Sequence, residues 1–172
     1  MKSNLYKHES LPTAPHLSMT ATNSESQNIG IILVDHGSRR EESNILLQQM
    51  ANLLASHAPW QIVEIAHMEL ASPTIAEAFA SCVQKGVQRI VVFPYFLSPG
   101  RHWKHDIPTL TAQAAQAFPQ IPFLVTAPIG VDPLLSALIQ QRIQQCLHNA
   151  SQHNQPCPYC LHQTERCRFH NL

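Results

Sequence analysis

The chain has 172 residues, of which 44% are hydrophobic and 13% are charged. That composition can bury the core of one globular domain, and it lacks the low hydrophobicity and high charge of a disordered protein. Eleven Lys and Arg residues balance eleven Asp and Glu residues, which argues against a nucleic-acid partner, and no apolar run is long enough to predict a membrane span. The eleven histidines, as many as Lys and Arg together, indicate metal chemistry or a pH-responsive surface.

Residues 1–28 are rich in Ser, Thr, Pro and Asn and show no apolar period, so we expect a disordered leader. They lack the continuous apolar stretch of a secretory signal. Lys2 and Lys7 are set against Glu9 and Glu25, whereas an organellar transit peptide is typically rich in Arg and poor in acidic residues. We therefore expect a cytoplasmic protein, with a plastid location as the alternative if the leader is a transit peptide.

From residue 29 onward, short β-branched runs alternate with stretches of helical period. The predicted strands are residues 29–34, 60–67, 89–94 and 121–127, and the predicted helices are residues 41–58, 73–85, 106–118 and 131–150. The spacing that predicts the first helix is that of Leu46, Met50, Leu53, Leu54 and His57. This alternation predicts a single α/β domain, residues 29–148, with a four-stranded parallel sheet and helices on both faces.

The loops after these strands hold most of the unusual polar residues of the core. They are His36, Arg39, Arg40, His67, Glu69, Arg101, His102, Lys104 and His105. Ligands of parallel α/β sheets bind beyond the carboxyl ends of the strands. We therefore expect these side chains to share one edge of the sheet.

Two of these residues, His36 and His102, are candidate ligands of one divalent first-row metal, for which neutral imidazole is a good donor. A site with two histidines leaves coordination positions open, so we expect the metal to exchange. Asp106 follows His102 by four residues and either holds its imidazole, caps the next helix, or does both.

Four basic residues flank the two histidines, and together they indicate an anionic partner rich in carboxylates. They are Arg39, Arg40, Arg101 and Lys104. Other reaction classes have no support, because the sequence contains no G-x-S-x-G, no Walker loop and no G-x-G-x-x-G. This argues against a serine hydrolase, an NTPase and a Rossmann dehydrogenase.

Three stretches, VDHGSRREESN (34–44), HMELASPTIAEAF (67–79) and PYFLSPGRHWKHDIP (94–108), resemble the signature loops of the small sirohydrochlorin chelatases. The resemblance covers residues 29–148. It implies a chelatase-like fold, a homodimer, and insertion of Co²⁺ or Fe²⁺ into sirohydrochlorin on the way to cobalamin or siroheme.

Carried over by position, the resemblance makes His36 and His102 the metal-site histidines and Glu69 the acidic residue after the second strand. The imidazoles or Glu69 would accept the pyrrolic protons of the macrocycle. The four basic residues would hold its peripheral carboxylates, and Tyr95, with Phe96 and Leu97, would line an apolar wall for the ring. His67 and His105 fall outside the pattern, so we expect them beside the ligands or at the surface.

After residue 149 the chain holds Cys157, Cys160 and Cys167 in the pattern C-x₂-C-x₆-C, which suits zinc or an iron–sulfur cluster. The fourth ligand would be Cys146, His162, His170 or a cysteine of a partner chain. This tail, residues 149–172, resembles the extension of plant-type iron-inserting members, which carries a [2Fe-2S] cluster. A tail of reduced thiols that binds nothing stays open, and Cys82 is expected in the core.

Two further interpretations compete with the chelatase. A non-enzymatic metal carrier would use the same two histidines and the Cys-rich tail, without any need for the basic residues or the apolar wall. A zinc-stabilised interaction module would use the tail and leave the core as a scaffold, with the loop signature as coincidence.

Overall fold

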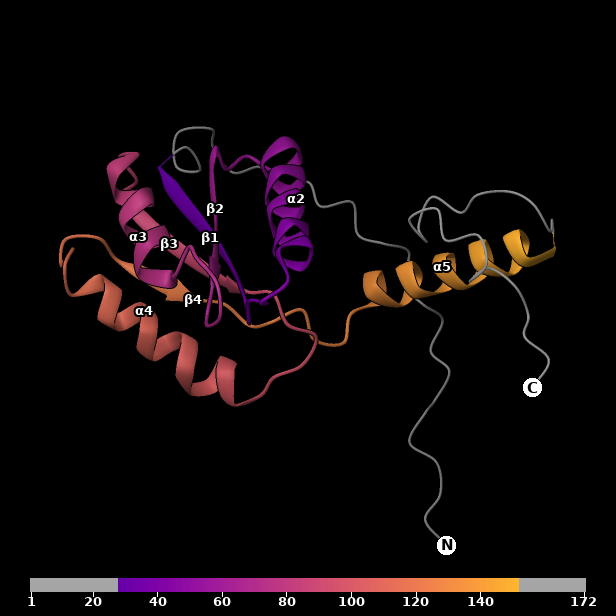
Figure 1. Ribbon diagram of the computed structural model, residues 1–172. Coiled ribbons are helices and arrows are strands. Elements are labelled where there is room, and N and C mark those ends of the chain that lie inside the picture. Colours follow the sequence, from indigo (N-terminus) through magenta and orange to yellow (C-terminus); the bar gives the residue numbers. More distant parts are fainter. Residues whose placement is uncertain (1–27, 152–172) are drawn as a thin grey trace, which may run out of the picture. The chain divides into compact units, whose positions relative to one another are not determined.

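The structure is a computed structural model that describes residues 28–151 (Figure 1). The predicted leader therefore lies outside the described residues except for its last position. So does the predicted tail beyond residue 151, with Cys157, Cys160 and Cys167. The division into a leader, a domain of residues 29–148 and a tail stays a prediction.

The described residues form a four-stranded parallel sheet in the order β2-β1-β3-β4. The strands are β1 (Ile29–Asp35), β2 (Ile62–His67), β3 (Arg89–Pro94) and β4 (Phe123–Val125). β1 lies at the centre, paired with β2 on one side and β3 on the other. Asp35 is in register with His67, so these two strands end together. The predicted sheet type is confirmed.

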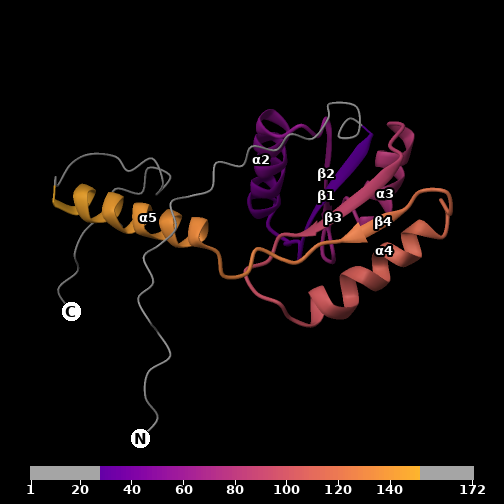
Figure 2. The same ribbon diagram turned by 180° about the vertical axis from the view of Figure 1, so that it is seen from behind.

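Helices cover both faces of the sheet, as predicted. They are α2 (Glu41–His57), α3 (Ile75–Gln84) and α4 (Ile107–Ala115), with a short π-helix, η1 (His102–Asp106), directly before α4. Figures 1 and 2, seen from opposite sides, show α2 on one face and α3 with α4 on the other. The crossover helices thus leave one edge of the sheet to the loops that follow the strands.

Several predicted boundaries shift by a few residues. The second strand begins at Ile62 rather than at residue 60, and the fourth is limited to residues 123–125. α3 begins at Ile75 rather than at Pro73, because Thr74 caps it: its hydroxyl accepts from the Glu77 amide while the Glu77 carboxylate accepts from the Thr74 amide. The predicted helix 106–118 is divided between η1 and α4.

The buried stripe of α2 differs from the residues whose spacing predicted the helix. Leu47 and Ala51 are its buried side chains, whereas Leu46 and Leu53 are more than half exposed. Met50 and Leu54 of the predicted set also pack, partly buried, against the cluster of Leu47 and Ala51, so the face of α2 that meets the sheet includes part of the predicted set. Apolar spacing alone does not choose between two neighbouring stripes.

The core between the sheet and the pair α3 and α4 centres on Ile32, Phe79 and Ile107, each fully buried. Cys82 of α3 is buried in the same cluster, as predicted. A smaller cluster packs α2 against the other face of β1 through Leu33 and Leu47. Both faces of β1 therefore point into apolar packing, which fixes the strand that carries the first site loop.

The last described helix, α5 (Pro133–Ser151), belongs to a separate compact unit that begins at Val131. It confirms the helix predicted over residues 131–150. Among the described residues, no helix combines the length and apolar character that a membrane crossing requires.

Candidate active site

Two histidines from separate loops meet at the carboxyl edge of the sheet. His36 follows β1 and His102 begins η1 after β3, and these two strands are neighbours in the sheet. The two imidazole rings lie 5.4 Å apart between centroids and meet edge to face at 69°. His36 and His102 therefore lie together at one edge of the sheet, as predicted.

η1 fixes the orientation of His102. A π-helix is a single widened turn that is frequent at functional sites, and here the Ile107 amide donates to the His102 carbonyl across five residues. The Trp103 indole donates to the Thr126 carbonyl at 2.8 Å, which ties the turn to the chain after β4. The position of His102 therefore depends on a contact with a distant segment.

Asp106 holds the ring of His102, with 2.8 Å between the His102 Nδ1 and the Asp106 Oδ2. A carboxylate only accepts hydrogen bonds, so Nδ1 donates, and a neutral ring held in this way keeps its lone pair on Nε2. The capping role is wrong: Asp106 has helical backbone angles and makes no side-chain cap bond, because the helical path already begins at η1. Of the two roles predicted for Asp106, the imidazole-holding one is observed.

Glu69 brings a carboxylate to the same place from the loop after β2. Its Oε2 lies 3.9 Å from Nε2 of His36, and the two side chains are 56% and 44% exposed. The pair is therefore open to solvent, and its separation is too long for a hydrogen bond but leaves room for a cation that both groups contact. All three residues predicted to act on the metal or on protons converge at this edge.

Hydrogen bonds to the backbone hold the loop that carries His36 in place. The Ser38 amide donates to the Asn44 Oδ1 and the Asn44 Nδ2 donates to the Ser38 carbonyl, both at 2.9 Å. The Glu69 amide donates to the His36 carbonyl at 3.1 Å. The loop after β1 is thus attached to α2 on one side and to the loop after β2 on the other.

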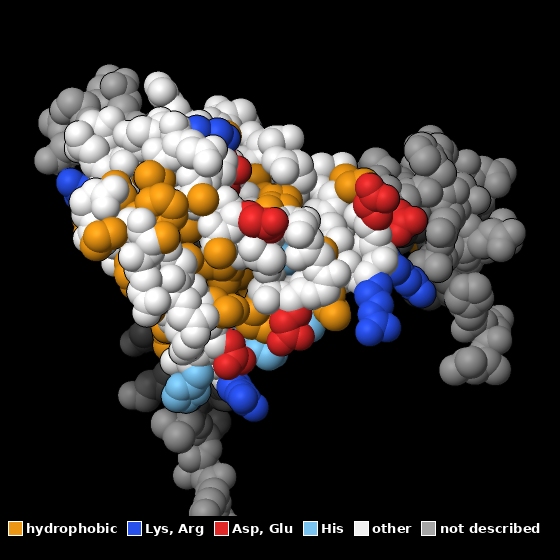
Figure 3. All heavy atoms as spheres, turned by 60° about the vertical axis from the view of Figure 1, so that its left-hand side comes forward, with side chains coloured by type: hydrophobic (Ala, Val, Ile, Leu, Met, Phe, Trp, Pro, Cys, Tyr) orange, Lys and Arg blue, Asp and Glu red, His pale blue; other side chains and the backbone are white. Residues whose placement is uncertain are grey.

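The four basic residues predicted to hold the substrate are all exposed: Arg39, Arg40, Arg101 and Lys104. The Arg101 side chain is 84% exposed, with its Nε 3.8 Å from Oδ1 of Asp106. Figure 3 shows histidine side chains at the lower edge of the view, next to acidic and basic ones. The charged groups therefore stand in solvent, where they can reach an anionic partner.

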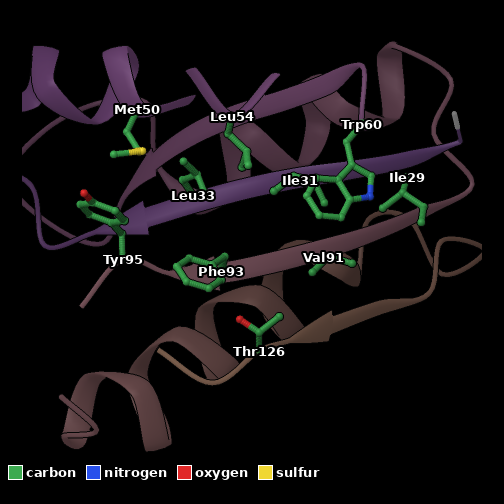
Figure 4. Close-up of a pocket in the computed structure, with 10 residues that line it drawn as sticks. All are labelled: Ile29, Ile31, Leu33, Met50, Leu54, Trp60, Val91, Phe93, Tyr95 and Thr126. Atoms are coloured by element: carbon green, nitrogen blue, oxygen red, sulfur yellow. The ribbon is translucent and has the colours of Figure 1, made fainter. Parts of the chain in front are cut away.

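Tyr95 lies directly after β3 and contributes to an apolar cavity of about 470 Å³ along β1 and β3. Figure 4 shows Tyr95 and Met50 at one end of this cavity and Trp60 and Ile29 at the other. Phe96 instead stacks near His102, with 6.3 Å between ring centroids, and Leu97 is 66% exposed. The predicted apolar wall is therefore divided: only Tyr95 faces the cavity.

The sequence predicts no role for Asp35, and it predicts His67 either beside the ligands or at the surface. The surface position is wrong, because the side chain is buried. His67 is 1% exposed, and its Nδ1 lies 2.6 Å from Oδ1 of Asp35. Both residues end strands that are neighbours in the sheet, and this pairing follows from the strand order and register rather than from any spacing in the sequence. His105, the other histidine outside the pattern, is exposed.

Within residues 28–151, no three His, Cys, Asp or Glu side chains form a group that could hold a metal ion, so His36, His102 and Glu69 are not arranged as a three-ligand site. The donor set at this edge is two imidazoles and one more distant carboxylate. Such a donor set leaves coordination positions open, as expected where a metal is passed on rather than kept.

Comparison with known proteins gives the family. The family model described as CbiX matches residues 30–146. The chain is 49% identical over 142 residues to the chloroplastic sirohydrochlorin ferrochelatase of Arabidopsis thaliana, a match covering 83% of this chain and 63% of the relative. It is 30% identical to the sirohydrochlorin cobaltochelatase of Sulfurisphaera tokodaii, covering 71% of this chain and 97% of that protein.

Solved structures agree. The sirohydrochlorin chelatase SirB of Bacillus subtilis subspecies spizizenii, in complex with cobalt, superposes with a TM-score of 0.59 at 29% identity, covering 74% of this chain and 50% of SirB. A cobalamin biosynthesis CbiX protein of Marinobacter aquaeolei superposes with a TM-score of 0.61 at 27% identity, covering 70% and 98%. The chain thus spans 63% of the Arabidopsis relative and half of SirB. By sequence and by fold, the chain belongs to the CbiX family, the family of these sirohydrochlorin chelatases.

Proposed function

We propose that the protein is a metal chelatase that inserts Fe²⁺ or Co²⁺ into sirohydrochlorin. The observation that carries the proposal is the meeting of the His36 and His102 rings, 5.4 Å apart, at the open edge of the sheet. The curated relatives include ferrochelatases and cobaltochelatases, which supports both metals. Imidazole accepts either ion, so the ligands do not select between them.

The chemistry follows from the arrangement of these groups. Insertion breaks two pyrrolic N–H bonds; each electron pair stays on nitrogen and bonds the metal, and two protons leave. The imidazoles of His36 and His102 present the partly dehydrated cation on one face of the ring. Glu69, whose Oε2 lies 3.9 Å from Nε2 of His36, takes one of the two protons, and an imidazole released by the departing cation takes the other.

The exposed basic side chains give the substrate its orientation. Guanidinium groups bind carboxylates through two parallel hydrogen bonds, so Arg39, Arg40 and Arg101, with Lys104 as a point charge, suit a polycarboxylate ring. Tyr95 offers an aromatic surface after β3 for the apolar part of the macrocycle.

The decisive experiment follows the absorbance of sirohydrochlorin after addition of Co²⁺ or, without oxygen, Fe²⁺. We expect His36→Ala and His102→Ala to slow insertion by about 10²-fold or more, the scale at which a positioned acid–base or ligand group acts. His105→Ala is the matched control, because His105 lies exposed on the same π-helix. Wild-type turnover in both site variants would overturn the proposal.

The same assay separates a chelatase from a non-enzymatic metal carrier. A carrier binds the cation through the same histidines but leaves the conversion of sirohydrochlorin at its uncatalysed rate. It also predicts that replacing Arg39 or Arg101 changes nothing, whereas a chelatase loses affinity for the substrate carboxylates. Metal binding with no acceleration would favour the carrier.

We further propose that Cys157, Cys160 and Cys167, with Cys146 as fourth ligand, hold a [2Fe-2S] cluster, with zinc as the alternative. The similarity to the Arabidopsis ferrochelatase supports iron as the metal substrate. Visible absorption and metal analysis of anaerobically purified protein test the cluster. A colourless, iron-free protein would remove it, and bound zinc would replace it.

Assembly and location complete the proposal. We propose a homodimer, which light scattering of the purified protein would reveal as twice the chain mass. The Arabidopsis relative is named as chloroplastic, which supports a plastid location over the cytoplasmic one. A fluorescent fusion to residues 1–28 tests this: retention in the cytoplasm would reject the transit peptide.

A further inference from the structure

His67 is a buried polar side chain that the proposed chemistry does not use. It ends β2, is 1% exposed, and its Nδ1 lies 2.6 Å from Oδ1 of Asp35. The carboxylate only accepts, so Nδ1 of His67 donates. A buried imidazole is costly unless such a bond is made, which gives the pair a definite geometry.

The same oxygen of Asp35 also closes the turn around His36. The Gly37 amide donates to Oδ1 of Asp35 at 2.9 Å, so one carboxylate oxygen accepts from both Gly37 and His67. His36 is the residue between the two ends of this turn. The direction in which its ring leaves the strand is therefore set by Asp35.

Backbone hydrogen bonds connect the pair of Asp35 and His67 to Glu69. The Met68 amide donates to the Asp35 carbonyl at 2.9 Å and the Glu69 amide to the His36 carbonyl at 3.1 Å. The loops after β1 and β2 therefore continue side by side past Asp35 and His67, the last paired residues of the two strands. His36 and Glu69 are the first side chains past this junction that reach the open edge.

We propose that Asp35 and His67 are positioning residues whose partly buried hydrogen bond sets the separation of His36 and Glu69, and so the affinity for the incoming metal. The inference rests on the proposed function. Neither residue touches substrate. Asp35 and His67 act on His36 and Glu69 through the backbone of the loops after β1 and β2, which meet at the Asp35 carboxylate.

The test uses two substitutions that differ in where they place a donor. In His67→Asn the amide nitrogen takes the position of Nδ1 and keeps the bond to Asp35, whereas in His67→Gln it takes the position of Nε2 and loses it. We expect the KM for Co²⁺ to rise about tenfold in His67→Gln, the scale reported for groups that orient metal ligands, and to stay near wild type in His67→Asn. The KM for sirohydrochlorin should stay unchanged in both.

A matched control accounts for any loss of stability. Thr111 of α4 is also fully buried, and its hydroxyl donates to the Ile107 carbonyl at 2.7 Å. Thr111→Val removes this bond without touching either loop, so it should lower the unfolding midpoint and leave the KM for Co²⁺ unchanged. A purely structural role for His67 predicts the same pattern in His67→Gln.

The outcomes separate the two proposals. Equal KM values for Co²⁺ in His67→Asn and His67→Gln overturn the positioning role while the chelatase stands. A wild-type protein that inserts no metal overturns the proposed function instead. Co²⁺ absorption of the protein without sirohydrochlorin gives a second readout: weakened binding in His67→Gln alone supports the inference, and equal binding in both variants rejects it.

Discussion

Gly37 is the residue at which the loop after β1 allows least variation. Its φ of +81° lies in the left-handed region, and a Cβ there would overlap the Glu69 carbonyl oxygen and lie 3.0 Å from Cβ of His67. Gly86 has nearly the same φ, +83°, but a Cβ there meets nothing within 4 Å. A side chain at either position would therefore meet the same backbone strain. The two positions differ only in how many atoms crowd the added Cβ.

Gly86→Ala should cost about 1 kcal/mol of unfolding free energy, the left-handed strain alone. Gly37→Ala should cost about 1–3 kcal/mol more, because the added methyl must displace the loop that carries Glu69. Urea unfolding measures both values. Only Gly37→Ala should also slow metal insertion, so equal effects of the two substitutions would contradict the crowding seen around Gly37.

Cys82 shows how burial controls the reactivity of a thiol. Burial raises the pKa of Cys82 to about 12, with the nearby Glu64 adding to the effect. The neutral thiol is therefore favoured in the folded state, and this contribution to stability is complete below the ordinary pKa of 9.0 and is lost as the pH rises toward 12.

We expect Cys82 to resist thiol reagents in the folded protein, because at about pH 8 only about 10⁻⁴ of it is thiolate. A variant with the other four cysteines replaced by Ser isolates it. That variant should label only after unfolding in urea. Labelling of the folded protein at the rate of a free peptide thiol would contradict the burial of Cys82.

Among the helices, α3 has the clearest sequence signal for its start. Thr74 and Glu77 form a reciprocal capping box, and the hydrogen bond from the Thr74 amide lowers the pKa of the Glu77 carboxyl from 4.5. A lowered pKa means that the folded state favours the carboxylate. Its contribution is therefore complete above the ordinary pKa and is lost as the pH falls through the lowered one.

Thr74→Ala should cost about 1 kcal/mol of unfolding free energy at neutral pH, the usual value of a cap. The difference between wild type and Glu77→Gln should shrink as the pH falls below 4.5, because Glu77 then becomes protonated and loses its advantage. Thermal unfolding over a pH series measures both. A difference that grows in acid would contradict the capping box.

η1 illustrates what local pattern could not predict. The sequence predicted a helix from residue 106, whereas the helical path begins near His102 with a widened turn. The bond from the Trp103 indole to the Thr126 carbonyl joins residues 23 apart in the chain. Periodicity carries no information about such a partner, so the turn that orients His102 appears only in the folded structure.

For the whole molecule, the alternation of strands and helices was sufficient to predict a parallel sheet and the edge on which the site lies. It did not predict the strand order, and the meeting of His36 with His102 depends on β1 and β3 being neighbours. The shared edge alone made His36 and His102 candidate ligands of one metal, and the family resemblance implied the same two residues. The partly buried hydrogen bond between Asp35 and His67 required the register of β1 and β2, which no spacing in the sequence gives.

The described site lies wholly between β1 and η1, so it should not depend on residues 151–172. A chain truncated after Ala150 removes three of the proposed cluster ligands and keeps His36, Glu69 and His102. Its rate of Co²⁺ insertion should stay within about twofold of the full chain, because the truncation removes none of the three residues proposed to act on the metal or on protons. With Fe²⁺ and Co²⁺ in competition, absorbance of the products should give the same metal ratio for both chains, since two imidazoles accept either ion. If truncation changed that ratio, the cysteines would take part in choosing the metal, and a large loss of rate would place part of the catalytic site beyond residue 150.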